Sequence, residues 1–148
     1  MIQRQALDMV SKLIGLPAWG PQVGPAGMTL QFGRKSVVAG VEEGDLSLWI
    51  KCEVKISGEG LVYVSRRWPT PENIKEQNQY FESAAVLKAG IDERNNSLRV
   101  LLRGERLLSV YPAHDLEAGC WILFDHTMQP SRRCLALFDS IEIEEEQT

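Results

Sequence analysis

The sequence predicts a mainly β protein with one N-terminal helix, folded as an antiparallel sandwich or a partly open barrel. Three observations support this α+β class. Apolar and polar residues alternate along much of the chain, turn-forming residues separate these short runs, and no strand–helix–strand repeat of a parallel nucleotide-binding sheet is present. The chain has 148 residues, 44% of them apolar, which is enough for one core and one domain.

The first segment predicts an amphipathic helix over residues 6–14, because its apolar side chains recur at the helical period. Gly15 can end this helix in a left-handed conformation, and Pro17 prevents its continuation. Residues 16–27 then hold three prolines and three glycines. We expect a structured loop there, with Trp19 anchoring it to the core.

The strongest strand signal is the alternation over residues 46–56, which predicts one long, half-buried antiparallel strand. Gly104 is expected to take a positive φ angle in a tight hairpin. Thr70 can cap a short, mostly solvated helix that begins at Pro71. Further strands are predicted at residues 28–32, 61–65, 84–89, 98–102, 107–111, 120–124 and 134–138.

Negative charge is concentrated at the C-terminus. The chain has 16 basic and 20 acidic residues, a net charge of −4, and residues 139–148 hold five of the acids and no base. The other 15 acids leave residues 1–138 with a net charge of +1. We therefore divide the chain into a β-rich domain, residues 1–138, and an acidic tail, residues 139–148. The tail is expected to be a solvated terminus, or an arm for a basic partner.

Cysteine usage and the termini bear on the compartment. Cys52, Cys120 and Cys134 are odd in number and far apart, without the paired spacing of zinc or redox sites. No signal-peptide core and no run of 18 apolar residues occurs. We expect a cytoplasmic, non-membrane protein that uses no metal and no cofactor.

Catalytic motifs are lacking, so we expect no catalytic residue and a protein that is not an enzyme. The enzymatic alternative is a small metal-independent ribonuclease that uses His114 and His126 as acid and base. The basic pairs Arg66-Arg67 and Arg132-Arg133 could contact nucleic acid. Because a body charge of +1 provides little counterion release, we expect these arginines to pair with nearby acids and nucleic acid not to be a partner.

Three segments together carry a resemblance. They are Leu13-Ile14-Gly15-Leu16-Pro17, then Gly27-Met28-Thr29-Leu30-Gln31-Phe32-Gly33, then Gly44-Asp45-Leu46-Ser47-Leu48-Trp49-Ile50, and the likeness extends to residue 124. The pattern resembles small bacterial single-domain proteins, among them immunity proteins of toxin–immunity systems. The chain departs from it at residues 117–121, where acid and tryptophan lie further apart than in that pattern. The resemblance implies an antitoxin that binds and occludes a cognate protein toxin, and it carries over no catalytic residue.

Acids could steer such a protein toward a basic nuclease toxin, and an exposed aromatic could anchor the contact. Trp49 is expected on the polar face of its strand, with burial under the N-terminal helix or a second sheet as the alternative. A structural protein that forms a homodimer or larger homo-oligomer through an exposed sheet edge also stays open. The expected partner-binding residues are Glu42, Glu43, Asp45, Trp49, Glu142, Glu144, Glu145 and Glu146.

Overall fold

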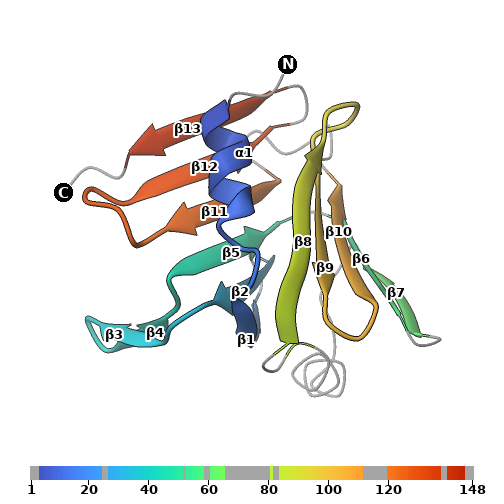
Figure 1. Cartoon of the computed structure of the whole chain (residues 1–148), viewed down its shortest axis with the longest axis horizontal. Coiled ribbons are helices and arrows are strands. Elements are labelled where there is room, and N and C mark those ends of the chain that lie inside the picture. Colours follow the sequence, from blue (N-terminus) through green and yellow to red (C-terminus); the bar gives the residue numbers. More distant parts are fainter. Residues whose placement is uncertain are drawn as a thin grey trace.

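The fold is an antiparallel sheet with a short N-terminal helix packed against it, as the sequence predicts (Figure 1). The structure, a computed structural model, describes residues 4–24, 27–51, 53–58, 61–65, 81, 84–111, 120–137 and 140–145. The helix predicted after Thr70 lies outside these residues. Helix α1 (Arg4–Ser11) is followed by a turn in which Gly15 has a φ of +88°, the left-handed conformation expected of it.

The strands of the described residues follow in chain order. They are β1 (Pro17–Gly24), β2 (Gly27–Phe32), β3 (Ser36–Val38), β4 (Val41–Glu43), β5 (Leu46–Ile50), β6 (Glu53–Gly58), β7 (Leu61–Ser65), β8 (Ala84–Asp92), β9 (Ser97–Leu102), β10 (Arg106–Tyr111), β11 (Trp121–Asp125), β12 (Arg132–Ala136) and β13 (Ile141–Glu145). Gly104, between β9 and β10, has a φ of +88°, which confirms its predicted role in that hairpin.

Eleven of these strands form one sheet in the order β13-β12-β11-β5-β2-β1-β8-β9-β10-β6-β7, and β3 and β4 form a separate hairpin. The first half of the sheet consists of β13, β12, β11, β5, β2 and β1, and the second half consists of β8, β9, β10, β6 and β7. The two halves are joined where β1 pairs with β8. Within the described residues, β13 and β7 remain at opposite ends of this order, so the sheet does not close into a barrel.

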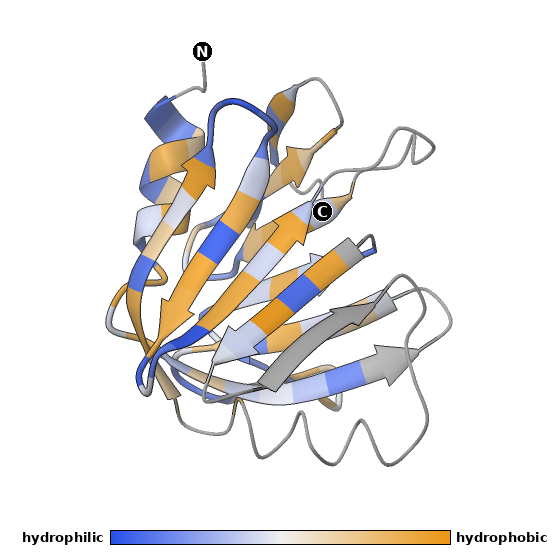
Figure 2. Ribbon diagram, turned by 90° about the vertical axis from the view of Figure 1, so that its right-hand side faces the viewer, coloured by the Kyte–Doolittle hydropathy of each residue, from blue (hydrophilic) through white to orange (hydrophobic). Residues whose placement is uncertain are grey.

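The core lies between the two halves. The indole N–H of Trp121, on β11, donates a hydrogen bond to the carbonyl oxygen of Asn96 in the β8–β9 turn, 3.0 Å away. Phe32 of the first half and Leu98 of the second half are both fully buried in the same apolar cluster. Polar residues alternate with these apolar ones along the strands (Figure 2), and α1 packs against β8, β11 and β13. This alternation defines an inner face toward the core and an outer face.

The prediction of one long strand over residues 46–56 is wrong in one respect, because this segment forms two strands, β5 and β6. β5 pairs with β2 and β11 in the first half, whereas β6 pairs with β10 and β7 in the second half. Between them, the N–H of Lys51 donates to the carbonyl oxygen of Cys120. Ile50 and Val54 are both buried, so the alternation passes through the break. The alternation of apolar and polar residues shows which face of a strand is buried, but it does not show which strand lies beside it.

The prediction of a loop over residues 16–27 is also wrong, because most of this segment forms strand β1. Its register with β2 shifts between Trp19 and Gln22, which places Pro21 in a β-bulge. Proline lacks an N–H for the ladder, but it is tolerated at the first residue of a strand and at bulges. Pro17 occupies that first position. β1 therefore takes the place between β2 and β8 despite its composition.

Residues 141–145 of the acidic terminus are not a solvated tail, because they form strand β13 against β12. Ile141 is 9% exposed and belongs to the core, and Ile143 packs against that core. Residues 141–145 therefore belong to the β-rich domain and not to a separate tail that begins at residue 139. Two apolar residues at alternate positions were enough to add a strand to the sheet, since its other face can stay polar.

Candidate partner-binding face

The outer face of the first half of the sheet carries two cross-strand rows of side chains. Because successive residues of a strand point to opposite faces, the neighbours of buried Leu48 and Ile50 point outward. The first row runs through Glu142, Leu135, Ile122, Trp49, Thr29 and Gln22. The second row runs through Glu144, Arg133, Phe124, Ser47, Gln31 and Trp19.

Trp49 lies near the middle of the first row and is half-buried. The ammonium of Lys51 lies 4.0 Å from the centroid of its ring. The placement on the polar face of its strand is thus confirmed. The alternative of burial beneath the helix or a second sheet is wrong, because α1 and the second half both lie on the inner face.

The β3–β4 hairpin stands apart from the main sheet beside this face (Figure 1). Ala39 and Gly40 form its turn with φ angles of +52° and +81°, the two positive values of a type I′ turn. Val37, Val38 and Val41 are 66%, 53% and 65% exposed. Val38 and Val41 pair across the ladder on one side of the hairpin, and Val37, as the neighbour of Val38, points to the other side. Exposed apolar side chains on a hairpin with polar neighbours are typical of protein contact sites.

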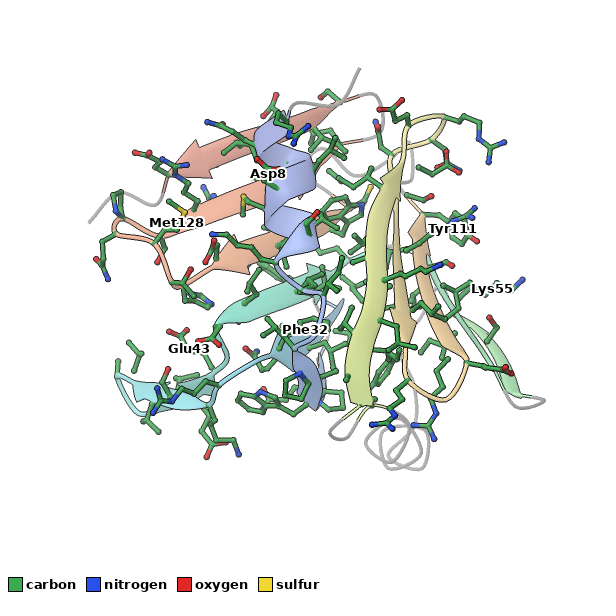
Figure 3. The ribbon with its side chains drawn as sticks, in the orientation of Figure 1. Asp8, Phe32, Glu43, Lys55, Tyr111 and Met128 are labelled. Carbon is green, nitrogen blue, oxygen red and sulfur yellow. The ribbon has the colours of Figure 1, made fainter. Side chains whose placement is uncertain are left out.

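A polar cluster connects the hairpin to the sheet, with Glu43 at the base of the hairpin (Figure 3). The side-chain oxygen of Gln31 accepts hydrogen bonds from the N–H of Gly44 at 3.0 Å and from the hydroxyl of Ser47 at 2.5 Å. The hydroxyl has one proton, so its oxygen accepts the hydrogen bond that joins it to Nε2 of His126 at 2.9 Å. Glu43 lies 3.6 Å from the same nitrogen.

This pattern assigns the proton of His126 to Nε2, as the donor toward Ser47. A general base that activates a serine needs the opposite direction, with the imidazole accepting the hydroxyl proton. The Ser47–His126 contact is therefore a structural hydrogen bond in this arrangement. His114, the other histidine of the ribonuclease alternative, lies outside the described residues.

Most of the expected acidic residues are engaged in contacts within the chain. The hydrogen-bond and ion-pair partners are Lys35 for Glu42, His126 for Glu43, the backbone N–H of Arg34 for Asp45, Arg133 for Glu144 and Arg132 for Glu145. The expectation that Arg132 and Arg133 pair with nearby acids is confirmed. A patch that steers a partner needs charged groups whose charge is not balanced within the chain. Fewer of the expected acids meet this requirement than the sequence suggested.

The structure brings only some of the expected residues together. Glu42 and Glu43 lie on the hairpin beside Trp49's face, whereas β13 is separated from β5 by β12 and β11. Glu145 alternates with Glu144 and so points to the other face of β13. Glu146 lies outside the described residues. The hairpin and the central rows therefore form the most compact part of the candidate site.

A pocket of about 630 Å³ lies between the hairpin and the β1–β2 end of the outer face. Its lining consists of Trp19, Gly20, Gln22, Thr29, Gln31, Lys35, Val41 and Glu42. Sequence reasoning missed this pocket because it treated Trp19 as a core anchor and residues 16–27 as a loop. The available signal was the polar face of residues 28–32, where Thr29 and Gln31 alternate with buried apolar residues.

Among the described residues, no group of three or more histidine, cysteine or acidic side chains is placed to hold a metal ion. In that same part of the chain, no helix has the length and apolar character needed to cross a membrane. Comparisons with family models, with curated proteins and with solved structures found no match to this chain.

Proposed function

We propose that this protein is an immunity protein that binds a cognate protein toxin, a basic nuclease, and neutralises it by occlusion. The observation that carries the proposal is the β3–β4 hairpin, which exposes Val37, Val38 and Val41 beside the outer face that holds Trp49. Burying such side chains against a partner removes apolar surface from water and stabilises a complex.

The composition of this region supports a protein partner. Aromatic residues in partly buried positions are common anchors of protein interfaces, and Trp19 and Trp49 both lie on the outer face. Polar pairs such as Lys35 with Glu42 border the valines, as the rim of an interface does.

The net charge of the whole molecule supports a basic partner more strongly than any single charged patch does. The net charge of −4 favours long-range attraction to a basic protein and speeds its association at low salt. Glu42 on the hairpin and Glu144 and Glu145 on β13 are partly neutralised by their lysine and arginine neighbours. These residues are therefore assigned to orientation and specificity at the contact.

The test is co-expression with the product of the adjacent gene, followed by affinity purification and a growth assay of toxicity. The three hairpin valines are replaced together, V37T/V38T/V41T, because threonine keeps the shape and strand preference but has a hydroxyl in place of one methyl group. We expect at least about a tenfold loss of affinity, since several apolar contacts are lost together. L87T is the matched control, because Leu87 is 50% exposed on β8 in the second half of the sheet.

If the adjacent product is neither toxic nor bound, the proposal fails. It also fails if the hairpin triple variant and L87T bind alike. The role of the acids on β13 is tested with E142Q/E144Q rather than by truncation, because removing β13 would also remove Ile141 from the core. A slower association rate at low salt is expected for this variant, and an unchanged rate would contradict a steering role for β13.

A further inference from the structure

The pocket between the hairpin and the outer face already holds a cation of the protein's own. The ammonium of Lys35 lies 4.7 Å from the centroid of the Trp19 ring and 3.4 Å from Oε2 of Glu42. An aromatic face and a carboxylate are the two groups that attract a cation in protein sites. Lys35 thus shows where a positive charge is favoured in this pocket.

The groups that hold this charge are positioned by the fold. The indole N–H of Trp19 donates to the carbonyl oxygen of Gly33 at 2.8 Å, which orients the ring. Gln31 is oriented by its hydrogen bonds from Gly44 and Ser47. The backbone of Glu42 is positioned by the pairing of Val37 with Glu42 in the β3–β4 ladder. The ring of Trp19 and the side chain of Gln31 are therefore preorganised, which lowers the entropic cost of binding a ligand.

Lys35, in contrast, is weakly held. Its side chain is 56% exposed and that of Glu42 is 58% exposed, so solvent screens their attraction. The pocket volume of about 630 Å³ greatly exceeds the space of one ammonium group. Lys35 can therefore leave toward solvent while another cation takes its position.

We propose that this pocket is a recognition subsite for the guanidinium group of an arginine on a basic partner, with Lys35 as an internal occupant that the arginine displaces. This inference rests on the proposed function, because it identifies the chemistry of the partner group. A guanidinium is planar and stacks on an aromatic face such as Trp19. Its several N–H donors suit the Glu42 carboxylate together with the oxygens of Thr29 and Gln22, which also line the pocket.

The direct test uses the full protein and a small probe, N-acetyl-arginine methylamide, followed through the Trp19 indole N–H signal in NMR. The control probe is N-acetyl-citrulline methylamide, a neutral compound of almost the same shape. We expect saturable shifts of the Trp19 signal with the arginine probe in the millimolar range, and none with citrulline. Equal shifts with both probes, or shifts that leave Trp19 unaffected, would overturn the proposal.

Three variants sharpen the test. E42Q removes the carboxylate charge and should weaken arginine binding about three- to fivefold, the range for an exposed ion pair. K35M removes the internal competitor and its repulsion, so it should strengthen binding at least about twofold. E93Q is the matched control, because Glu93 is exposed in the turn after β8 and should leave affinity unchanged. Weaker binding by K35M, or equal loss in E42Q and E93Q, would contradict the proposal.

The two proposals fail separately. If the arginine probe binds at Trp19 but the adjacent gene product is not bound, the subsite stands and the immunity function falls. If the toxin is bound while the arginine probe is not, the subsite is overturned and the immunity function stands.

Discussion

Lys12, one residue beyond the end of α1, forms an ion pair with Asp125 at the end of β11, with Nζ and Oδ2 2.5 Å apart. The Asp125 side chain is fully buried, and its other oxygen accepts hydrogen bonds from the N–H and the hydroxyl of Thr127. Burial raises the pKa of Asp125, but the bonds from Lys12 and Thr127 lower it further, so its pKa lies below the ordinary value. This pair connects the N-terminal helix to the first half of the sheet.

Replacing Lys12 by methionine should lower the free energy of unfolding by about 2 kcal/mol at pH 7. Removing one partner of a buried pair costs about 3–5 kcal/mol, and we take a lower value because Lys12 is 41% exposed and solvent screens part of the interaction. Urea unfolding measures the change. R4M is the control, because the Arg4–Asp8 pair is exposed at both ends and its loss should be barely measurable. Equal effects of the two variants would contradict this account.

The pH dependence follows from the lowered pKa of Asp125. A carboxyl whose pKa is lower in the folded than in the unfolded state stabilises the fold above its unfolded pKa, and that stability is lost as the pH falls through its folded pKa. We therefore expect D125N to be less stable than the natural protein at pH 7, with a smaller difference below about pH 4, where the unfolded carboxyl is protonated. Unfolding curves measured from pH 7 to pH 3 test this. A constant difference between the two proteins would contradict it.

Asp92, at the end of β8, should titrate unusually low. Hydrogen bonds from the side chain and backbone N–H of Arg94 lower its pKa to about 2, with a smaller contribution from the charge of Arg99. In R94Q we expect the pKa of Asp92 to rise toward 3.8 without reaching it, because the backbone bond and Arg99 remain. NMR titration of the carboxyl carbon measures this. R103Q, in the β9–β10 turn, should leave the value unchanged, and a similar rise there would argue against the Arg94 contact.

The thiol of Cys134 should be inert in the folded protein. It is fully buried in β12, and this burial raises its pKa to about 12. Because the thiolate is the reactive form, alkylation by iodoacetamide at pH 8 should proceed only through unfolding. Mass spectrometry of the peptide containing Cys134, with and without urea, makes the comparison. Rapid alkylation without denaturant would show that the site is open.

Gly44 should not tolerate a side chain. A Cβ atom there would lie 2.9 Å from the backbone nitrogen of Phe32 and closer still to its carbonyl oxygen, so β2 or the strand entry to β5 would have to shift. We expect G44A to destabilise the protein by about 2 kcal/mol or more, as overpacking against backbone does. G90A is the control, because a Cβ at Gly90 meets nothing within 4 Å. Equal stability of the two variants would contradict the close approach of Gly44.

The same close approach explains part of the glycine pattern that carries the family resemblance. A Cβ at Gly27 would collide with the backbone at Ile50, and one at Gly33 would collide with the side chain of Asp45. Together with Gly44, these glycines lie where β2 and β5 come close. They have a structural reason to be glycine, so they do not by themselves indicate a binding site.

The candidate site was only partly predictable. The outward position of Trp49 followed from alternation, and the pairing of Arg132 and Arg133 with acids followed from charge. The network of Gln31, Ser47 and His126 was not predictable, because these residues lie on β2, β5 and beyond β11 and meet only through cross-strand register. Register depends on which strands become neighbours, and side-chain order along one strand does not record it.

What the sequence by itself determined is local: the mainly β class, the amphipathic helix, the buried faces of β2 and β5, and the left-handed turns at Gly15 and Gly104. The tertiary structure alone decided that residues 46–56 divide between the two halves of the sheet, that a proline-rich segment forms β1, and that the acidic terminus forms β13. The physical reason is that periodicity encodes which side chains leave water. Backbone pairing, in contrast, is decided between segments that are far apart in the chain and meet only in the fold.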